Sequence, residues 1–121
     1  MKVFVYGSLL SGFGNHRLLE GSRLIGHAKT PPGYRMHSLG GFPGVVPTGN
    51  AVVHGEVYEV DAQTLAALDR LEGHPRFYRR RPICLANGAI VDTYLLSQHQ
   101  VADRPVVATG DWRRHRQGAE R

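Results

Sequence analysis

The first residues that could do chemistry form a turn of small residues, Tyr6-Gly7-Ser8-Leu9, directly after a β-branched and aromatic segment, Lys2 to Tyr6. A chain that leaves a strand through Gly-Ser can turn sharply, so that successive backbone N–H groups line one concave surface. Such a cradle binds a carboxylate or a developing oxyanion. An ordinary tight turn with Gly7 at positive φ accounts for the same residues, and both interpretations stay open.

The second candidate is the carboxylate of Glu72, at the end of a predicted helix. Leu65 and Leu68 mark the apolar face of the segment 62–71, and Glu72 follows them by seven and four residues, so it lies on that face. A carboxylate aimed at a core must be paired, protonated or functional, and a raised pKa suits an acid/base catalyst. Alternatively, Glu72 ends the helix in solvent or pairs with a nearby arginine. The arginines within reach are Arg70, Arg76 and Arg79.

The other reactive residue types predict no catalytic or metal site. The seven histidines include no H-E-x-x-H pair, and although His54 and Glu56 share a strand face, scattered surface histidines are the better interpretation. No G-x-S-x-G motif surrounds Ser8. The single cysteine, Cys84, cannot form an internal disulfide, and its strand context predicts an inert core thiol.

Composition favours one globular domain. The chain has 121 residues, of which 41% are hydrophobic and 21% charged, and its apolar runs are too short for a membrane span. Because the N-terminus lacks signal-peptide features, we expect a cytoplasmic protein. The net charge of +5 suggests a nucleic-acid binder, but four arginines lie within 76–81 and five follow position 103, which a solvated face and a tail explain. We therefore expect one domain over 1–112 and a polar, flexible tail over 113–121 whose arginines are dispensable.

The elements that must position these residues are short, because 15 glycines and seven prolines interrupt the chain. The pattern predicts an α+β fold in which six or seven strands close into a small mixed β-barrel with one or two helices. Asp61 and Gly73 bound the longer helix, Gly55 marks a bulge or a close backbone approach, and Asn87-Gly88 predicts a two-residue type I′ turn. Strands are expected over 2–6, 22–28, 34–39, 51–60, 78–86, 89–96 and 105–109, helices over 15–20 and 62–72, and a loop over 39–44.

Several motifs along the chain carry a family resemblance. They are Val5-Tyr6-Gly7-Ser8-Leu9 with Asn15-His16, Gly41-Phe42-Pro43, Val53-His54-Gly55-Glu56-Val57-Tyr58, Leu68-Asp69-Arg70-Leu71-Glu72-Gly73, Phe77-Tyr78-Arg79-Arg80 and Gly110-Asp111-Trp112. In this order they resemble the gamma-glutamylcyclotransferase-like proteins, close to the gamma-glutamylamine cyclotransferase branch. The amine-specific relatives carry basic residues where this chain has Leu10-Ser11, so the resemblance leaves the leaving amine unassigned.

The resemblance implies a cofactor-independent enzyme of the lyase or acyltransferase type on a small six- or seven-stranded barrel. Its reaction releases 5-oxoproline and a free amine or amino acid from a γ-glutamyl substrate, by attack of the substrate's own α-amine on the γ-carbonyl. The partner is then a small molecule, with no metal, nucleic acid or membrane, and a monomer and a homodimer both stay open. The implied roles are catalysis for Glu72 and substrate binding for Tyr6, Gly7, Ser8, Leu9 and Tyr78.

Two other functions remain open at this point. A non-catalytic module on the same fold would hold an acidic metabolite in the cradle, and a nucleic-acid binder would use the arginines of 76–81 and of the tail. An anion binder gains nothing from a carboxylate at Glu72, which favours catalysis.

Overall fold

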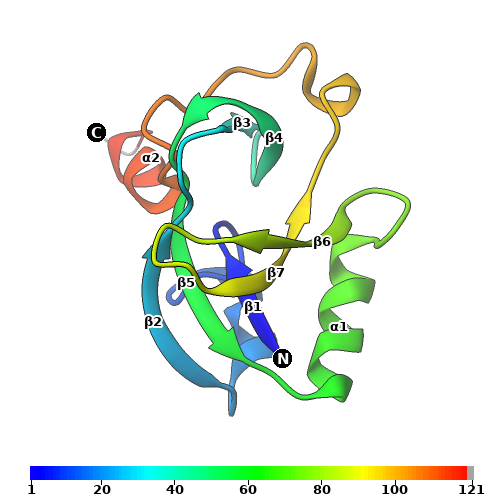
Figure 1. Ribbon diagram of the computed structural model, residues 1–121. Coiled ribbons are helices and arrows are strands. Elements are labelled where there is room, and N and C mark those ends of the chain that lie inside the picture. The colour runs from blue at the N-terminus through cyan, green and yellow to red at the C-terminus, as the bar shows by residue number, and fades with distance from the viewer. Residues whose placement is uncertain (120–121) are drawn as a thin grey trace.

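The computed structural model describes residues 1–119, which form two sheets flanked by short helices (Figure 1). In chain order the elements are β1 (Lys2–Val5), η1 (Gly14–Leu19), β2 (Arg23–Lys29), β3 (Tyr34–Ser38), β4 (Pro43–Ala51), β5 (His54–Glu59), α1 (Ala62–Glu72), β6 (Arg79–Cys84), β7 (Ile90–Leu95), η2 (His99–Val101) and α2 (Trp112–Ala119). The helices α1 and α2 lie at opposite sides of the molecule (Figure 1). Within residues 1–119, every helix is too short or too polar to cross a membrane.

Five strands form one mixed sheet in the order β2-β5-β1-β7-β6, and β3 and β4 pair as a separate ribbon. The central strand β1 runs antiparallel to β5 and parallel to β7. The N–H of Leu96, after β7, donates to the C=O of Val45 on β4 at 2.9 Å and so connects the sheet to the ribbon. The N–H of Ala86, after β6, donates to the C=O of Lys29 at 2.9 Å and so connects the two edge strands of the five-stranded sheet. The α+β class is therefore confirmed, and the strands of residues 1–119 pair as a five-stranded sheet and a two-stranded ribbon, so the closed barrel stays a prediction.

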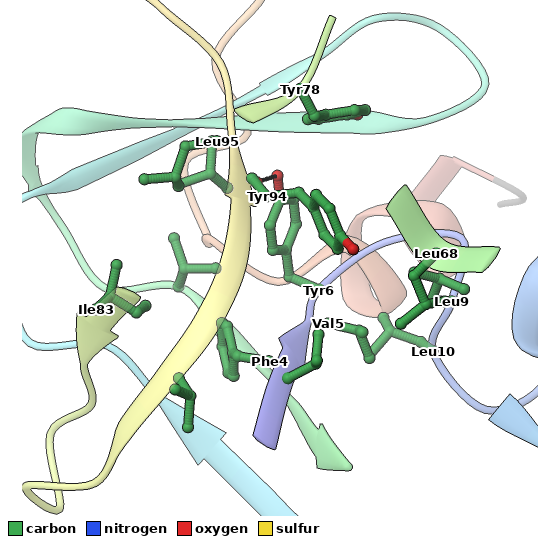
Figure 2. Close-up of a cluster of buried hydrophobic side chains, with 14 of the residues drawn as sticks. Phe4, Val5, Tyr6, Leu9, Leu10, Leu68, Tyr78, Ile83, Tyr94 and Leu95 are labelled. Carbon is green, nitrogen blue, oxygen red and sulfur yellow. Dashed lines mark hydrogen bonds between the residues drawn. The ribbon is translucent and has the colours of Figure 1, made fainter. Parts of the chain in front are cut away.

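The core is built around β1, whose residues Val3, Phe4 and Val5 are consecutive and buried. A strand whose successive residues are all buried is covered on both faces, so its sequence is a continuous apolar run. Side chains from α1, β6 and β7 pack around it, as Figure 2 shows for Leu68, Ile83 and Leu95. Gly55 on the neighbouring β5 is required by this packing, because a Cβ there would lie 2.3 Å from the carbonyl oxygen of Val5. The close backbone approach predicted at Gly55 is confirmed.

The helix α1 has the boundaries that the sequence predicts. Asp61 Oδ1 accepts a hydrogen bond from the N–H of Thr64 at 2.7 Å, which caps the first turn. Gly73 ends the helix in the left-handed conformation, at φ 67°. Because Leu65 and Leu68 are buried, the face that they share with Glu72 is the face turned toward the sheet.

Three local predictions were wrong. The expected loop over 39–44 is shorter, because β4 already begins at Pro43; its Gly and Pro residues are typical of turns and hide the strand. The turn between β6 and β7 is not type I′: within residues 1–119 every positive φ belongs to a glycine, so Asn87 lacks the conformation that type I′ needs. Instead, the N–H of Gly88 donates to the C=O of Leu85 across a three-residue loop. Cys84 is exposed, because it lies on the face of β6 opposite the buried Ile83.

Smaller differences concern the segments that flank these elements. The first helical segment is a 3-10 helix, because Asn15 donates its side-chain amide to Ser8 Oγ and does not cap a helix. The expected strand over 105–109 is reduced to a single bridge between His37 and Val106.

The segment after Asp111 is the largest correction, because the expected flexible tail is helical over Trp112–Ala119. The indole of Trp112 is buried and anchors the first turn. Next to it, Arg113 forms an ion pair with the carboxylate of Glu56 at 3.3 Å. The sequence pattern missed these contacts because one buried aromatic residue makes no apolar periodicity. The last two residues of the expected tail, 120–121, lie outside the described part of the chain.

Candidate active site

The turn after β1, the end of α1 and the residue before β6 meet at a small cavity of about 20 Å³. Five of the six predicted site residues line it, since only Ser8 is missing from the lining. The hydroxyl oxygen of Ser8 instead accepts a hydrogen bond from Asn15 Nδ2 at 2.9 Å. The lining residues are Phe4, Val5, Tyr6, Gly7, Leu9, Pro43, Glu72, Tyr78 and Tyr94, most of which Figure 2 shows.

The turn itself presents free backbone donors. The C=O of Gly7 accepts the N–H of Leu10 at 3.0 Å, which closes the turn. The three residues before Leu10 are Gly7, Ser8 and Leu9. None of their backbone N–H groups has an acceptor within residues 1–119. Successive unpaired N–H groups are the physical basis of an anion-binding nest.

Gly7 is needed for a reason other than the expected positive φ, which it does not adopt. A Cβ at this position would lie 2.7 Å from Cγ of Pro43 at the start of β4. A side chain would therefore push the turn and β4 apart. The interpretation of Gly7 as a positive-φ turn residue was wrong, and close packing accounts for it.

The carboxylate of Glu72 is partly buried and has no hydrogen bond or ion pair within residues 1–119. Burial alone raises the pKa of Glu72 to about 7, because no donor compensates for the lost water. Neither a solvent-exposed helix end nor a pair with Arg70, Arg76 or Arg79 describes it. Its position on the Leu65 and Leu68 face is confirmed by its place in the cavity lining.

Three tyrosines enclose the carboxylate, and each hydroxyl already donates to the protein. Tyr6 donates to the C=O of Tyr94 at 2.5 Å and Tyr78 to the C=O of Pro43 at 2.5 Å, while Tyr94 donates to Asp69 Oδ1 at 2.7 Å. Burial, together with the negative charge of Glu72, raises the pKa of Tyr78. Burial is the main cause that raises the pKa of Tyr6, and the negative charge of Glu72 adds to it. These rings are neutral, fixed walls at neutral pH.

An ion network that the sequence reasoning missed holds the end of α1. Arg80 donates to both oxygens of Asp69, at 2.9 and 3.2 Å, and its other terminal nitrogen reaches Asp92 at 3.5 Å. Hydrogen bonds from Arg80 and Tyr94 outweigh burial and keep the pKa of Asp69 below its ordinary value. The signal was present, since Asp69 and Arg80 belong to motifs of the family resemblance, but nothing local to either residue shows that they pair.

A second missed residue, Glu56, holds the far end of the same turn. Its carboxylate accepts hydrogen bonds from the N–H and the hydroxyl of Ser11, both at 2.9 Å, from Tyr58 at 3.1 Å and from Arg113 at 3.3 Å. Leu10 is buried and Ser11 is occupied by Glu56, so neither lines the cavity. Within residues 1–119, His54, which shares a strand face with Glu56, belongs to no group of three side chains that could hold a metal ion.

Known proteins match the chain over the elements that build this site. A family model described as "Gamma-glutamyl cyclotransferase, AIG2-like" matches residues 3–114. A Vibrio cholerae protein is 43% identical over 110 residues, covering 91% of this chain and 93% of its own. The Escherichia coli gamma-glutamylcyclotransferase family protein YtfP is 38% identical over 112 residues, and its solution NMR structure covers 93% of this chain at a TM-score of 0.73.

A bovine protein named gamma-glutamylaminecyclotransferase is more distant. It is 37% identical over 97 residues, which are 69% of this chain and 55% of the bovine one. The family model, in contrast, spans β1, its turn, α1 and β7, which contribute most of the cavity lining. On this match the chain belongs to the gamma-glutamyl cyclotransferase, AIG2-like family.

Proposed function

We propose that the protein is an enzyme that converts a γ-glutamyl amine or γ-glutamyl amino acid into 5-oxoproline and the free amine or amino acid. One observation carries the proposal: an unpaired carboxylate whose pKa is raised to about 7, Glu72, borders the same small cavity as the turn with free N–H groups. A proton acceptor and an anion cradle are the two parts that this cyclisation needs.

The carboxylate of Glu72 supplies the acid/base chemistry. The α-amine of the substrate is an ammonium at neutral pH and has no free electron pair. Glu72 takes one of its protons, and the nitrogen attacks the γ-carbonyl carbon to close a five-membered ring. Glu72 returns this proton to the leaving nitrogen as its bond to the γ-carbon breaks. The ring nitrogen loses a second proton as it becomes an amide, and that proton goes to the released amine, which leaves as an ammonium. A pKa of about 7 lets the group accept and donate with nearly equal ease.

The turn supplies binding and charge stabilisation. The N–H groups of Gly7, Ser8 and Leu9 bind either the α-carboxylate of the glutamyl group or the oxyanion that develops on its γ-carbonyl. Tyr6 and Tyr78 form walls that keep water from the reacting atoms. Each step is a proton transfer or an acyl transfer within the substrate, so the proposal includes no metal or organic cofactor.

Substrate entry requires movement of the lining. A cavity of about 20 Å³ holds about one water molecule, so a glutamyl group enters only as side chains at its rim are displaced. Tyr78 and Pro43 both line the cavity and are joined by one hydrogen bond, and breaking this bond would let them separate and enlarge the cavity.

The test is release of 5-oxoproline from a panel of γ-glutamyl amino acids and γ-glutamyl amines. We expect release from at least one compound, and its loss in a Glu72→Gln variant that keeps the shape of the side chain. Binding of these compounds without release in the parent protein would instead identify a non-catalytic module. Equal release by parent and variant would contradict the role of Glu72.

A further inference from the structure

A groove of about 420 Å³ lies next to the cavity, between β4, the segment leading into β6 and the chain after β7. Its volume falls in the range of about 300–1,000 Å³ that is usual for small-molecule sites. Phe77 lines the groove while Tyr78 lines the cavity, and their rings meet edge to face at 5.0 Å between centroids. On β7, Leu95 lines the groove and its neighbour Tyr94 lines the cavity. The two spaces are therefore separated by little more than these side chains.

The groove carries positive charge that the protein does not neutralise. Arg76, Arg79 and Arg81 line it, no Asp or Glu does, and none of the three arginines forms an ion pair within residues 1–119. Their neighbour Arg80 shows the contrast. Because side chains alternate along a strand, Arg80 lies on the other face of β6, where it forms ion pairs with Asp69 and Asp92. Unpaired guanidinium groups in a concave site attract anions and bind carboxylates with two parallel hydrogen bonds.

We propose that this groove binds the leaving half of the substrate, and that the leaving half carries a carboxylate in addition to the amide that is cleaved. The inference rests on the proposed function, because it places the γ-glutamyl half in the cavity and the rest of the substrate beyond Tyr78. The preferred substrates are then γ-glutamyl amino acids or peptides with an acidic leaving half. Simple γ-glutamyl amines, which lack that carboxylate, are poorer substrates.

The test compares three compounds that share the glutamyl half. γ-Glutamyl-glutamate and γ-glutamyl-glutamine differ only in one charge, and γ-glutamyl-butylamine has no carboxylate on the leaving side. We expect kcat/KM for 5-oxoproline release to fall in that order, by about tenfold for each carboxylate that the leaving half loses, the size of one charge-assisted hydrogen bond. The difference is expected to shrink at high salt, because the arginines are exposed.

Variants locate the effect. In a variant that combines Arg79→Gln with Arg81→Gln, we expect the ratio of kcat/KM for γ-glutamyl-glutamate to kcat/KM for γ-glutamyl-butylamine to be close to one. Arg23→Gln is the matched control, since Arg23 is an exposed arginine on the opposite edge strand β2, and it is expected to keep the parent ratio. Thermal unfolding of each variant verifies that the fold is intact.

The outcomes separate the two proposals. Equal kcat/KM for the three compounds, or an unchanged ratio in the double arginine variant, overturns the assignment of the groove and leaves the cyclotransferase proposal standing. No 5-oxoproline from any compound overturns both. A preference for the acidic substrate that the double variant loses and the Arg23→Gln control keeps supports the groove as the site of the leaving half.

Discussion

Two carboxylates border the same turn and have opposite properties. Glu56 is only 2% exposed, yet its pKa is lowered, because hydrogen bonds from Ser11 and Tyr58 and the charge of Arg113 outweigh the effect of burial. The Glu72 residue is more exposed to solvent, yet burial raises its pKa to about 7, because it receives no hydrogen bond that would offset the burial. Depth alone does not decide the charge state of a buried acid. The number of donors that replace its water does.

The difference assigns separate tasks to the two acids. Glu56 is a charged acceptor that ties Ser11, and thus the end of the turn, to β5 and α2. Glu72 is free to exchange a proton because nothing in the protein holds it ionised. A turn whose N–H groups are to bind a substrate must itself be fixed by other contacts. The hydrogen bonds between Ser11 and Glu56 fix the end of this turn.

The largest expected effect comes from removing the proton acceptor that we propose, Glu72. Glu72→Gln keeps the size of the side chain but cannot take a proton, and loss of a general base lowers a rate by about 10²- to 10⁴-fold. Single-turnover formation of 5-oxoproline at saturating substrate measures this step directly. Because the turn is unchanged, the variant is expected to bind substrate. Turnover within about threefold of the parent would show that Glu72 is structural.

The same substitution is expected to change how stability depends on pH. Since the folded pKa of Glu72, about 7, lies above the ordinary value of 4.5, the folded state binds the proton more tightly than the unfolded state. The parent is therefore most stable below pH 4.5, relative to Glu72→Gln, and loses stability as pH rises to 7.

The size of that loss follows from the two pKa values. At pH 8 we expect the variant to be more stable than the parent by up to about 3 kcal/mol, with the difference vanishing at about pH 4. Urea unfolding of both proteins across this range measures it. A difference that does not vary with pH would mean that the carboxylate is solvated or paired in solution.

Replacing the other acid is expected to have the reverse effect on stability. Glu56→Gln removes the charge that Ser11 and Arg113 recognise and is expected to destabilise the fold by about 2 kcal/mol near neutral pH, the size of a hydrogen bond to a charged group. Glu20→Gln, which neutralises an exposed acid, is the control. Equal midpoints of urea unfolding for the two variants would contradict the role of Glu56.

The contrast between the two acids also explains what could be predicted from the sequence. Glu72 was found because its position depends on helical periodicity, which Leu65 and Leu68 display within seven residues. The boundaries of α1 followed equally from the local capping residues Asp61 and Gly73. Glu56 was missed because its partners Ser11 and Arg113 lie 45 and 57 residues away, and no local pattern reports such pairs.

The same distinction holds for the rest of the fold. The strand β1 is recognisable because its residues are apolar in their own right, whereas β4 is hidden because its Gly-Val-Val-Pro-Thr-Gly sequence resembles a turn and only its pairing with β3 makes it a strand. The type of the turn at Asn87-Gly88 was wrong because the Asn87 side chain bonds to the N–H of Ala89 in a three-residue loop. The strand β4 therefore depends on a long-range pairing, whereas the turn depends on a local side-chain bond that the residue types alone do not specify.

The smallest expected effect separates two adjacent arginines of α2, both of which the sequence predicts to be dispensable. Arg113 reaches Glu56 and Ser11 Oγ at 3.3 Å and lies over the ring of Phe13, 5.6 Å from its centroid, whereas Arg114 is exposed. Since the Arg113 side chain is 37% exposed, its ion pair is partly screened, and we expect Arg113→Gln to lower the free energy of unfolding by about 1 kcal/mol. Arg114→Gln is expected to change it by less than about 0.5 kcal/mol. Because Glu56 acts through Arg113, combining Arg113→Gln with Glu56→Gln is expected to cost less than the sum of the two single losses, and a strictly additive cycle would show that the two side chains do not interact.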